Sequence, residues 1–445
     1  DTGEEPPAGP RLASLGASRR AGRQECRIPA PVRRHALALE AALREDVPGA
    51  FRAARDGLAE VSAQVETFAD PSVRAHAGRA GERLAAFALG LAVRDGTPEH
   101  VFEWSERWRA VTAPAHSGAP AGPERVGAAL GSGTLVEYLV DGDALLAVVI
   151  GGEGVLLRRL GPVRPVEEAV VRLRYALRRQ SARRDWLREP QGAPEPGDLG
   201  VVAGEVERLL FGGMTGALGD GPLVVVPVGA LHTVPWGVLP GLRERAVSVA
   251  ASAASWLRAR AGKRGGGPPV VVAAAGPALA HAHAEVAHVL ACHPRGREVP
   301  ARTGPVLEAM ATADVLHLAA HGVFHARSPL VSGITLEDGP LMAYDLLTVT
   351  RAPALVVLSA CNSGMSRTPM EGAPLGLPGT FLAGGAACVI ASMVPVPDEA
   401  ARTVMSAFHE LVAAGQAPDA ALAQASAKTG VYEFACFGAG DRPLG

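Results

Sequence analysis

The chain has 445 residues, of which 48% are hydrophobic and 20% charged, and its formal net charge is −2. This length is typical of two or three domains, and the hydrophobic fraction is ample for a core. A net charge near zero gives no electrostatic argument for nucleic acid or a membrane as a partner, so we expect neither. The sequence contains no apolar run long enough to span a bilayer and no signal-peptide segment near its start.

Cysteine usage indicates a reduced compartment. The chain has 5 cysteines, an odd number, and no CxxC pair. A disulfide framework needs paired cysteines, so this pattern is that of a cytoplasmic protein. The richness in Ala, Gly, Arg and Pro resembles the products of high-GC bacterial genomes.

The first part of the chain predicts a linker followed by helices. Residues 1–30 are rich in Pro, Gly, Ala and Arg without periodicity, which is typical of a disordered segment or linker. Residues 31–127 carry apolar side chains at three-to-four spacing, interrupted by a Pro- and Gly-rich stretch at 112–123. The pattern resembles a remnant of a TPR-like helical array. Because this region lacks a nucleophile–base pair, we expect it to bind a regulatory sensor or partner protein. A chain starting near Gly131 should then keep the chemistry.

Residues 128–440 predict a domain built on a sheet. Two apolar strands at 134–140 and 144–150 flank Asp141-Gly142-Asp143, which is a strong hairpin signal. Further apolar strands alternate with helical segments and are expected at 223–227, 270–275, 314–319, 356–360 and 387–392. Strands that alternate with helices predict the α/β class, with a mostly parallel sheet flanked by helices.

A histidine and a cysteine follow two of these strands. The strand near 314–319 leads to His321, and the strand near 356–360 leads to Cys361. Open α/β sheets carry their chemistry at the carboxyl ends of the strands, where an imidazole and a thiol can make a cysteine nucleophile. No third acid is obvious, but a backbone carbonyl can orient the imidazole, because tautomer choice needs only one acceptor.

The remaining histidines and cysteines of this domain have structural interpretations. His317 alternates with leucines inside a strand, which favours a packed, hydrogen-bonded core residue. His325 lies in the next loop, where it is solvated or contacts a substrate. Cys388 and Cys436 lie in apolar strands and predict core residues, and on spacing alone Cys361 could also be a buried structural cysteine.

Five ordered blocks of sequence resemble the CHAT family of caspase-like cysteine peptidases, which often follow TPR repeats. The blocks are His-Leu-Ala-Ala-His-Gly at 317–322, Leu-Glu-Asp-Gly at 336–339, Leu-Ser-Ala-Cys-Asn-Ser-Gly at 358–364, Gly-Thr-Phe-Leu-Ala-Gly-Gly-Ala at 379–386 and Val-Ile-Ala-Ser-Met-Val-Pro-Val-Pro-Asp at 389–398. The resemblance covers most of residues 204–440 and implies a caspase/separase-type fold with a His–Cys dyad. By these motifs His321 matches the family's histidine and Cys361 its nucleophile.

Further expectations concern the surroundings of the dyad. Gly322 and the backbone N–H of Cys361 are the expected oxyanion hole, because a glycine lets a substrate carbonyl approach closely; a simple turn glycine is the alternative. The resemblance to separase-like enzymes implies that Asp398 faces a basic P1 side chain. Asp398 also precedes a helical segment, so a helix N-cap is the alternative. Met393-Val394 stands where the family usually has Leu-Trp, which would reshape this pocket.

We expect no metal ion and no cofactor. His281, Glu285, His288 and Cys292 have a spacing that permits a metal site on one helix face, but an exposed helix explains them equally. The glycine-rich loop at 265–269 precedes a strand and does not follow one, which argues against a nucleotide-binding regulator.

The sequence therefore predicts a cysteine endopeptidase that cleaves a protein substrate after a basic residue, in a bacterial regulatory or defence pathway. The alternative is a non-proteolytic CHAT-fold signalling or interaction module.

Overall fold

The computed structural model describes residues 29–68, 71–112, 120–186, 197–262, 267–325, 329–349, 351–361, 363–364 and 376–444. The disordered segment predicted over residues 1–30 lies almost entirely outside these ranges, as do Cys26 and most of the linker predicted at 112–123. Within these ranges no helix is long and apolar enough to cross a membrane.

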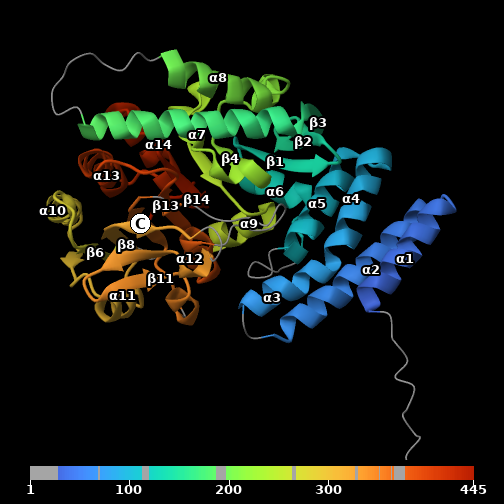
Figure 1. Cartoon of the computed structure of the whole chain (residues 1–445), viewed down its shortest axis with the longest axis horizontal. Coiled ribbons are helices and arrows are strands. Elements are labelled where there is room, and N and C mark those ends of the chain that lie inside the picture. Colours follow the sequence, from blue (N-terminus) through green and yellow to red (C-terminus); the bar gives the residue numbers. More distant parts are fainter. Residues whose placement is uncertain are drawn as a thin grey trace, which may run out of the picture.

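One large sheet of 11 strands organises the molecule (Figure 1). Its order is β3-β2-β1-β4-β5-β14-β13-β12-β8-β6-β7. The strands are β1 (Thr134–Asp141), β2 (Ala144–Gly151), β3 (Gly154–Pro162), β4 (Leu223–Val226), β5 (Val247–Val249), β6 (Val271–Ala275), β7 (Gly296–Glu298), β8 (Val315–Ala319), β12 (Leu355–Ser359), β13 (Cys388–Ser392) and β14 (Phe434–Gly438). The central strands are apolar runs buried along their whole length, as in sheets covered on both faces.

The sheet consists of two parallel blocks that run in opposite directions. In one block β1, β4, β5 and β14 are parallel neighbours, and in the other β13, β12, β8, β6 and β7 are. The blocks meet at the antiparallel pair β13–β14, and the hairpins β1–β2 and β2–β3 extend the outer edge. The predicted mostly parallel α/β sheet is therefore confirmed, with an antiparallel joint that the sequence did not indicate.

Helices cover both faces of the sheet. The helical region contains α1 (Ala30–Leu43), α2 (Val47–Glu66), α3 (Pro71–Gly78), α4 (Glu82–Asp95), α5 (Pro98–Thr112) and α6 (Pro123–Leu130). The sheet domain adds α7 (Val163–Trp186), α8 (Gly197–Phe211), α9 (Ala253–Ala261), α10 (Ala282–Cys292), α11 (Thr303–Met310), α12 (Leu377–Ala383), α13 (Asp398–Ala413) and α14 (Pro418–Thr429). One face of β12 and β13 packs Val357 and Ile390 against Phe408 of α13, and the other face contributes Leu358 and Val389 to the largest core cluster.

A small three-stranded sheet follows β8 directly. It contains β9 (Gly322–Val323), β10 (Gly333–Leu336) and β11 (Gly339–Met342), in the order β11-β10-β9. β10 and β11 form a hairpin with Glu337 and Asp338 in its turn. The Thr335 N–H donates to the His321 carbonyl at 2.8 Å, so this sheet fixes the chain at the end of β8.

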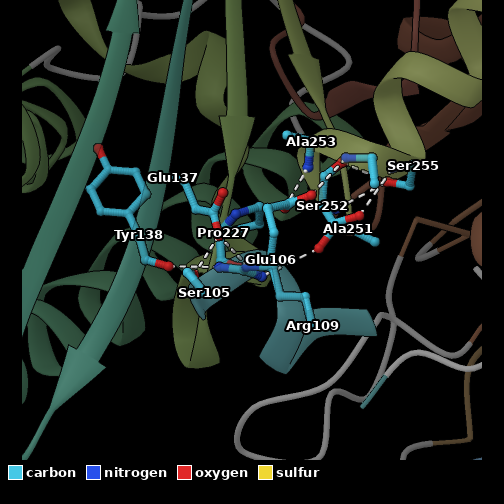
Figure 2. Close-up of polar contacts among 11 residues, drawn as sticks. Ser105, Glu106, Arg109, Glu137, Tyr138, Pro227, Ala251, Ser252, Ala253 and Ser255 are labelled. Carbon is cyan, nitrogen blue, oxygen red and sulfur yellow. Dashed lines mark hydrogen bonds and ion pairs between the residues drawn. The ribbon is translucent and has the colours of Figure 1, made fainter. Parts of the chain in front are cut away.

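A buried polar cluster anchors the helical region to the sheet (Figure 2). The Arg109 guanidinium on α5 lies 2.8 Å from the Glu137 carboxylate on β1, and the two side chains are 5% and 0% exposed. The remaining guanidinium N–H groups donate to the carbonyls of Tyr138, Pro227 and Ala251. Arg109 therefore binds α5 to three separate segments of the sheet domain. The division of the chain into residues 31–127 and 128–440 stays a prediction, and this cluster spans it.

Candidate active site

The register of β8 and β12 brings His321 and Cys361 to the same edge of the sheet. These neighbouring parallel strands pair up to Ala319 and Ser359, and the Ala320 N–H still donates to the Ser359 carbonyl at 3.2 Å. His321 and Cys361 each follow this last pair by two residues. Both side chains therefore start from equivalent places at the carboxyl ends of adjacent strands, where α/β sheets carry their chemistry.

Gly322 joins the two strand ends by close backbone packing. A Cβ atom built on Gly322 would collide with the Cys361 carbonyl oxygen and touch the Ala360 methyl group. Its φ is not positive, so space and not backbone freedom requires a glycine here. In the antiparallel pairing of β9 with β10, Gly322 lies opposite Ile334. The next residues along, His321 and Thr335, are hydrogen-bonded to each other. Because hydrogen-bonded and non-hydrogen-bonded pairs alternate, Gly322 and Ile334 make no backbone hydrogen bond with each other. The Gly322 N–H therefore points away from β10.

The His321 imidazole is held by a carbonyl from a neighbouring loop. Its Nε2 lies 3.3 Å from the carbonyl oxygen of Ala278, in the loop between β6 and α10. Because a carbonyl only accepts, Nε2 carries the proton and Nδ1 keeps the lone pair that a base needs. Ala278 has a φ of 61°, a left-handed conformation that is uncommon for a residue with a side chain.

The Cys361 thiol is half-buried and is also held by a carbonyl. Its Sγ donates to the Val396 carbonyl, in the loop between β13 and α13, at 3.4 Å. Among the described residues no hydrogen bond joins Cys361 to His321, and the sulfur instead faces the Val396 carbonyl. A thiolate cannot donate this bond, and deprotonation would release the sulfur from it.

Asp398 ties these two loops together. It is the first residue of α13, and its Oδ2 accepts the N–H of His281 at 2.8 Å, directly before α10. The N-cap of α13 is Pro397, so the alternative that Asp398 caps its own helix is wrong; the carboxylate instead serves the start of α10. Its Oδ1 makes no hydrogen bond within the described part of the chain. The side chain is half-buried.

The remaining predicted residues lie outside this constellation. His317 is fully buried and hydrogen-bonded, and Cys388 and Cys436 are 1% exposed, as core residues should be. Glu285 is buried against His317, whereas His288 lies at the surface beside Glu410, so these two side chains of the hypothetical metal site diverge. In the described ranges no three His, Cys, Asp or Glu side chains are placed to hold a metal ion.

Two groups at the site were missed by sequence reasoning, namely the carbonyls of Ala278 and Val396. Backbone groups carry no residue signature, so only local punctuation could have indicated them. Gly276-Pro277 after β6 is such a signal, because it marks a sharp turn at the end of a strand.

The CHAT domain family matches residues 201–429 of the chain. A search of curated proteins by sequence finds no match. Among solved structures, the fold is similar to the Saccharomyces cerevisiae separase–securin complex at 3.0 Å resolution, with a TM-score of 0.51 and 9% identity over 89% of this chain and 37% of that chain. The same complex at 2.6 Å resolution gives a TM-score of 0.52 and 8% identity over 84% of this chain and 38% of that chain.

A weaker similarity, with a TM-score of 0.39, relates the chain to the complex of Porphyromonas gingivalis RgpB pro- and mature domains, at 10% identity over 55% of this chain and 70% of that chain. The chain spans little more than a third of the separase chain it matches. At these identities the separase structures establish the fold alone, a caspase-like mostly parallel sheet preceded by a helical region. The sequence match covers more than half of the 445 residues, and the chain belongs to the CHAT domain family.

Proposed function

We propose that the chain is a cysteine endopeptidase in which His321 is the general base and Cys361 the nucleophile. The observation that carries the proposal is the register of β8 and β12, which brings both residues to one sheet edge at equivalent places. The Ala278 carbonyl supports it, because it leaves His321 Nδ1 unprotonated without a third acidic residue.

The reaction follows from these groups. His321 Nδ1 takes the thiol proton, and the Cys361 thiolate attacks the substrate carbonyl carbon. The resulting oxyanion accepts hydrogen bonds from the N–H groups of Gly322 and Cys361. As the oxyanion collapses, the C–N bond breaks, the imidazolium gives its proton to the leaving amine, and the acyl group stays on Cys361 as a thioester. His321 then takes a proton from water, which attacks the thioester and releases the acid, and the proton returns to the Cys361 sulfur.

We further propose that the substrate is a protein cleaved after a basic residue, with Asp398 as the anion of the P1 pocket. One carboxylate oxygen is engaged by the His281 N–H, and the other is left for a guanidinium or ammonium group. The setting would be a bacterial regulatory or defence pathway, in which the helical region binds a sensor or partner protein.

The test is cleavage of a fluorogenic peptide panel by wild type, Cys361→Ala and His321→Ala proteins. We expect both variants to lose nearly all activity, because each removes one half of the dyad. Normal turnover by folded Cys361→Ala protein would refute the dyad. Cys388→Ser serves as the control, because that thiol is buried in β13 and should affect stability but not turnover.

The alternative function, a non-proteolytic signalling or interaction module, is favoured by one observation. Within the described part of the chain the Cys361 sulfur makes its hydrogen bond with the Val396 carbonyl and not with His321. A module predicts that an electrophilic thiol probe leaves Cys361 unlabelled and that Cys361→Ala behaves like wild type in every cleavage assay. The peptidase predicts labelling that depends on His321.

A further inference from the structure

Four buried side chains form a continuous row of hydrogen bonds beside the candidate site. Glu285 on α10 contacts His317 on β8, with 3.0 Å between Oε1 and Nε2. His317 Nδ1 lies 3.1 Å from Nε2 of His409 on α13, and His409 Nδ1 lies 3.1 Å from Nε2 of His293, which ends α10. All four residues are at most 3% exposed. The row therefore links α10, β8 and α13 in the interior.

All three hydrogen bonds are satisfied when the histidines are neutral. The Glu285 carboxylate accepts, so His317 donates to it from Nε2 and has its Nδ1 free to accept. His409 then donates from Nε2 to His317 Nδ1, and His293 donates from Nε2 to His409 Nδ1. Burial lowers the pKa of His409 well below its ordinary value, and the neighbouring His317, His293 and His288 lower it further. Burial also lowers the pKa of His293, with a smaller contribution from His317.

The same three elements carry the candidate dyad. β8 leads directly to His321. α10 follows the loop whose Ala278 carbonyl holds the imidazole, and α13 follows the loop whose Val396 carbonyl holds the Cys361 thiol. A shift of either helix against β8 would move its carbonyl relative to the dyad.

We propose that this row is a positioning network, in which His409 acts with Glu285, His317 and His293 to fix α10 and α13 against β8 and so to aim the imidazole and the thiol. The inference rests on the proposed function of His321 and Cys361. It explains why the interior keeps four titratable side chains where apolar residues would pack without a desolvation cost.

The experiment is peptide-resolved alkylation of Cys361 by iodoacetamide across pH, in the full chain. The rate reports the thiolate and needs no substrate. His409→Phe keeps much of the volume but removes two bonds of the row, Glu285→Leu removes the acceptor at its end, and Glu285→Gln keeps that acceptor without the charge. Val404→Ala is the matched control, because it reduces buried volume on the same helix and makes no hydrogen bond in the row.

We expect the alkylation rate near neutral pH to fall about tenfold in His409→Phe and Glu285→Leu, because small misplacements of reacting groups are costly. Their pH profiles should approach that of His321→Ala. Glu285→Gln and Val404→Ala should keep the wild-type profile, even where the control lowers the melting temperature. If His409→Phe does not fold, the comparison of Glu285→Leu with Glu285→Gln decides.

Two results would overturn the inference in different ways. Wild-type alkylation profiles in folded His409→Phe and Glu285→Leu, with losses of stability like that of Val404→Ala, would make the row a purely structural core. A wild-type profile that His321→Ala leaves unchanged would refute the dyad itself, and the positioning role with it.

Discussion

Ala278 holds the candidate base from a backbone conformation that its own side chain disfavours. At a φ of 61° a residue with a Cβ costs about 1–2 kcal/mol relative to glycine. Such strain persists only where the surrounding structure imposes it, and here the strained residue presents its carbonyl to His321. The strain therefore belongs to the positioning of the imidazole.

Replacement of Ala278 by Gly should relieve this strain without moving the carbonyl. Glycine loses more entropy on folding, so we expect a net gain in stability of at most about 1 kcal/mol. Turnover should be unchanged. Urea denaturation measures the change in stability, and the peptide assay measures turnover. Ala284→Gly, at an exposed position of α10, is the control and should lose about 1 kcal/mol. Equal losses at the two positions would contradict the strain argument.

The role of Asp398 can be separated from its contact with His281. Asp398→Asn keeps an acceptor for the His281 N–H, so stability should change little. Loss of the charge should lower kcat/KM for peptides with Arg or Lys at P1 by at least about tenfold and leave Leu peptides unaffected. The wild-type protein should prefer Arg and Lys in the same panel.

A uniform loss on all P1 residues would contradict the pocket assignment. Asp398 would then serve only to join the two loops. Asp338→Asn is a useful control, because that carboxylate also accepts a backbone N–H, from Thr303, and belongs to the hairpin of the small sheet.

At the scale of elements, the sequence predicts strands better than their arrangement. β8 and β12 are apolar runs long enough to be recognised in the sequence. The positions of His321 and Cys361 just after these strands can therefore be predicted. β5 and β7 have three residues each and give no periodic signal. The insertion of β14 between β5 and β13, antiparallel to β13, depends on packing between segments far apart in sequence. For the same reason the contacts of His321 and Cys361 with carbonyls of other loops could not be read from local patterns.

Glu106 couples α5 to α9 and should give the fold a measurable pH dependence. Its oxygens accept the N–H groups of Ala253 and Ala254 at the start of α9, which favours the anion. Burial and then the nearby Glu137 outweigh these bonds and raise the pKa of Glu106 from 4.5 to about 8. A raised pKa means that the folded state holds the proton more tightly than the unfolded state. The stability it contributes is complete below pH 4.5 and is lost as the pH rises toward 8.

Glu106→Gln should remove this dependence. A glutamine has only one acceptor oxygen for the two N–H groups at the start of α9. At low pH, where the wild-type carboxyl is protonated, we expect the variant to be less stable by about 1–3 kcal/mol. The stability of wild type relative to the variant should then fall steadily between pH 4.5 and 8. Urea denaturation at a series of pH values measures the difference. Glu103→Gln, on the partly exposed side of α5, is the control and should show no such trend. A difference that is constant or rises with pH would refute the raised pKa.

At the scale of the whole molecule, the helical region completes the sheet domain. α5 and α6 supply Trp104 and Val126 to a core cluster that also contains Leu135 of the first hairpin, Trp256 of α9 and Phe51 of α2. Figure 1 shows α1 and α2 farthest from the sheet, with α4 and α5 between them and the first strands. The inner helices are thus one layer of the sheet domain, and α2 packs on them from outside, with Phe51 stacked on Trp104.

This arrangement changes the expected result of truncation. A chain that starts at Gly131 lacks α1–α6, so it exposes the apolar face of β1 and β2 and leaves the buried Glu137 without Arg109. Loss of one partner of a buried ion pair alone costs about 3–5 kcal/mol, a large part of the stability of a typical domain. A chain that starts at Glu82 loses α1–α3 and keeps both the cover of the sheet and the Arg109–Glu137 pair, but it exposes Trp104, on which Phe51 of α2 stacks.

We therefore expect the chain starting at Glu82 to be folded, with a lower melting temperature than the full chain and with Cys361 alkylated at a rate close to wild type. The chain starting at Gly131 should aggregate or unfold. Size-exclusion chromatography, thermal unfolding and peptide-resolved alkylation measure the three properties. Arg109→Met in the full chain separates the two causes, because it removes the charge partner of Glu137 but keeps the apolar cover. If the Gly131 chain is monomeric with the melting temperature of the full chain, the helices are a separable module. If only Arg109→Met is strongly destabilised, the polar cluster, and not the apolar cover, binds the helical region to the sheet.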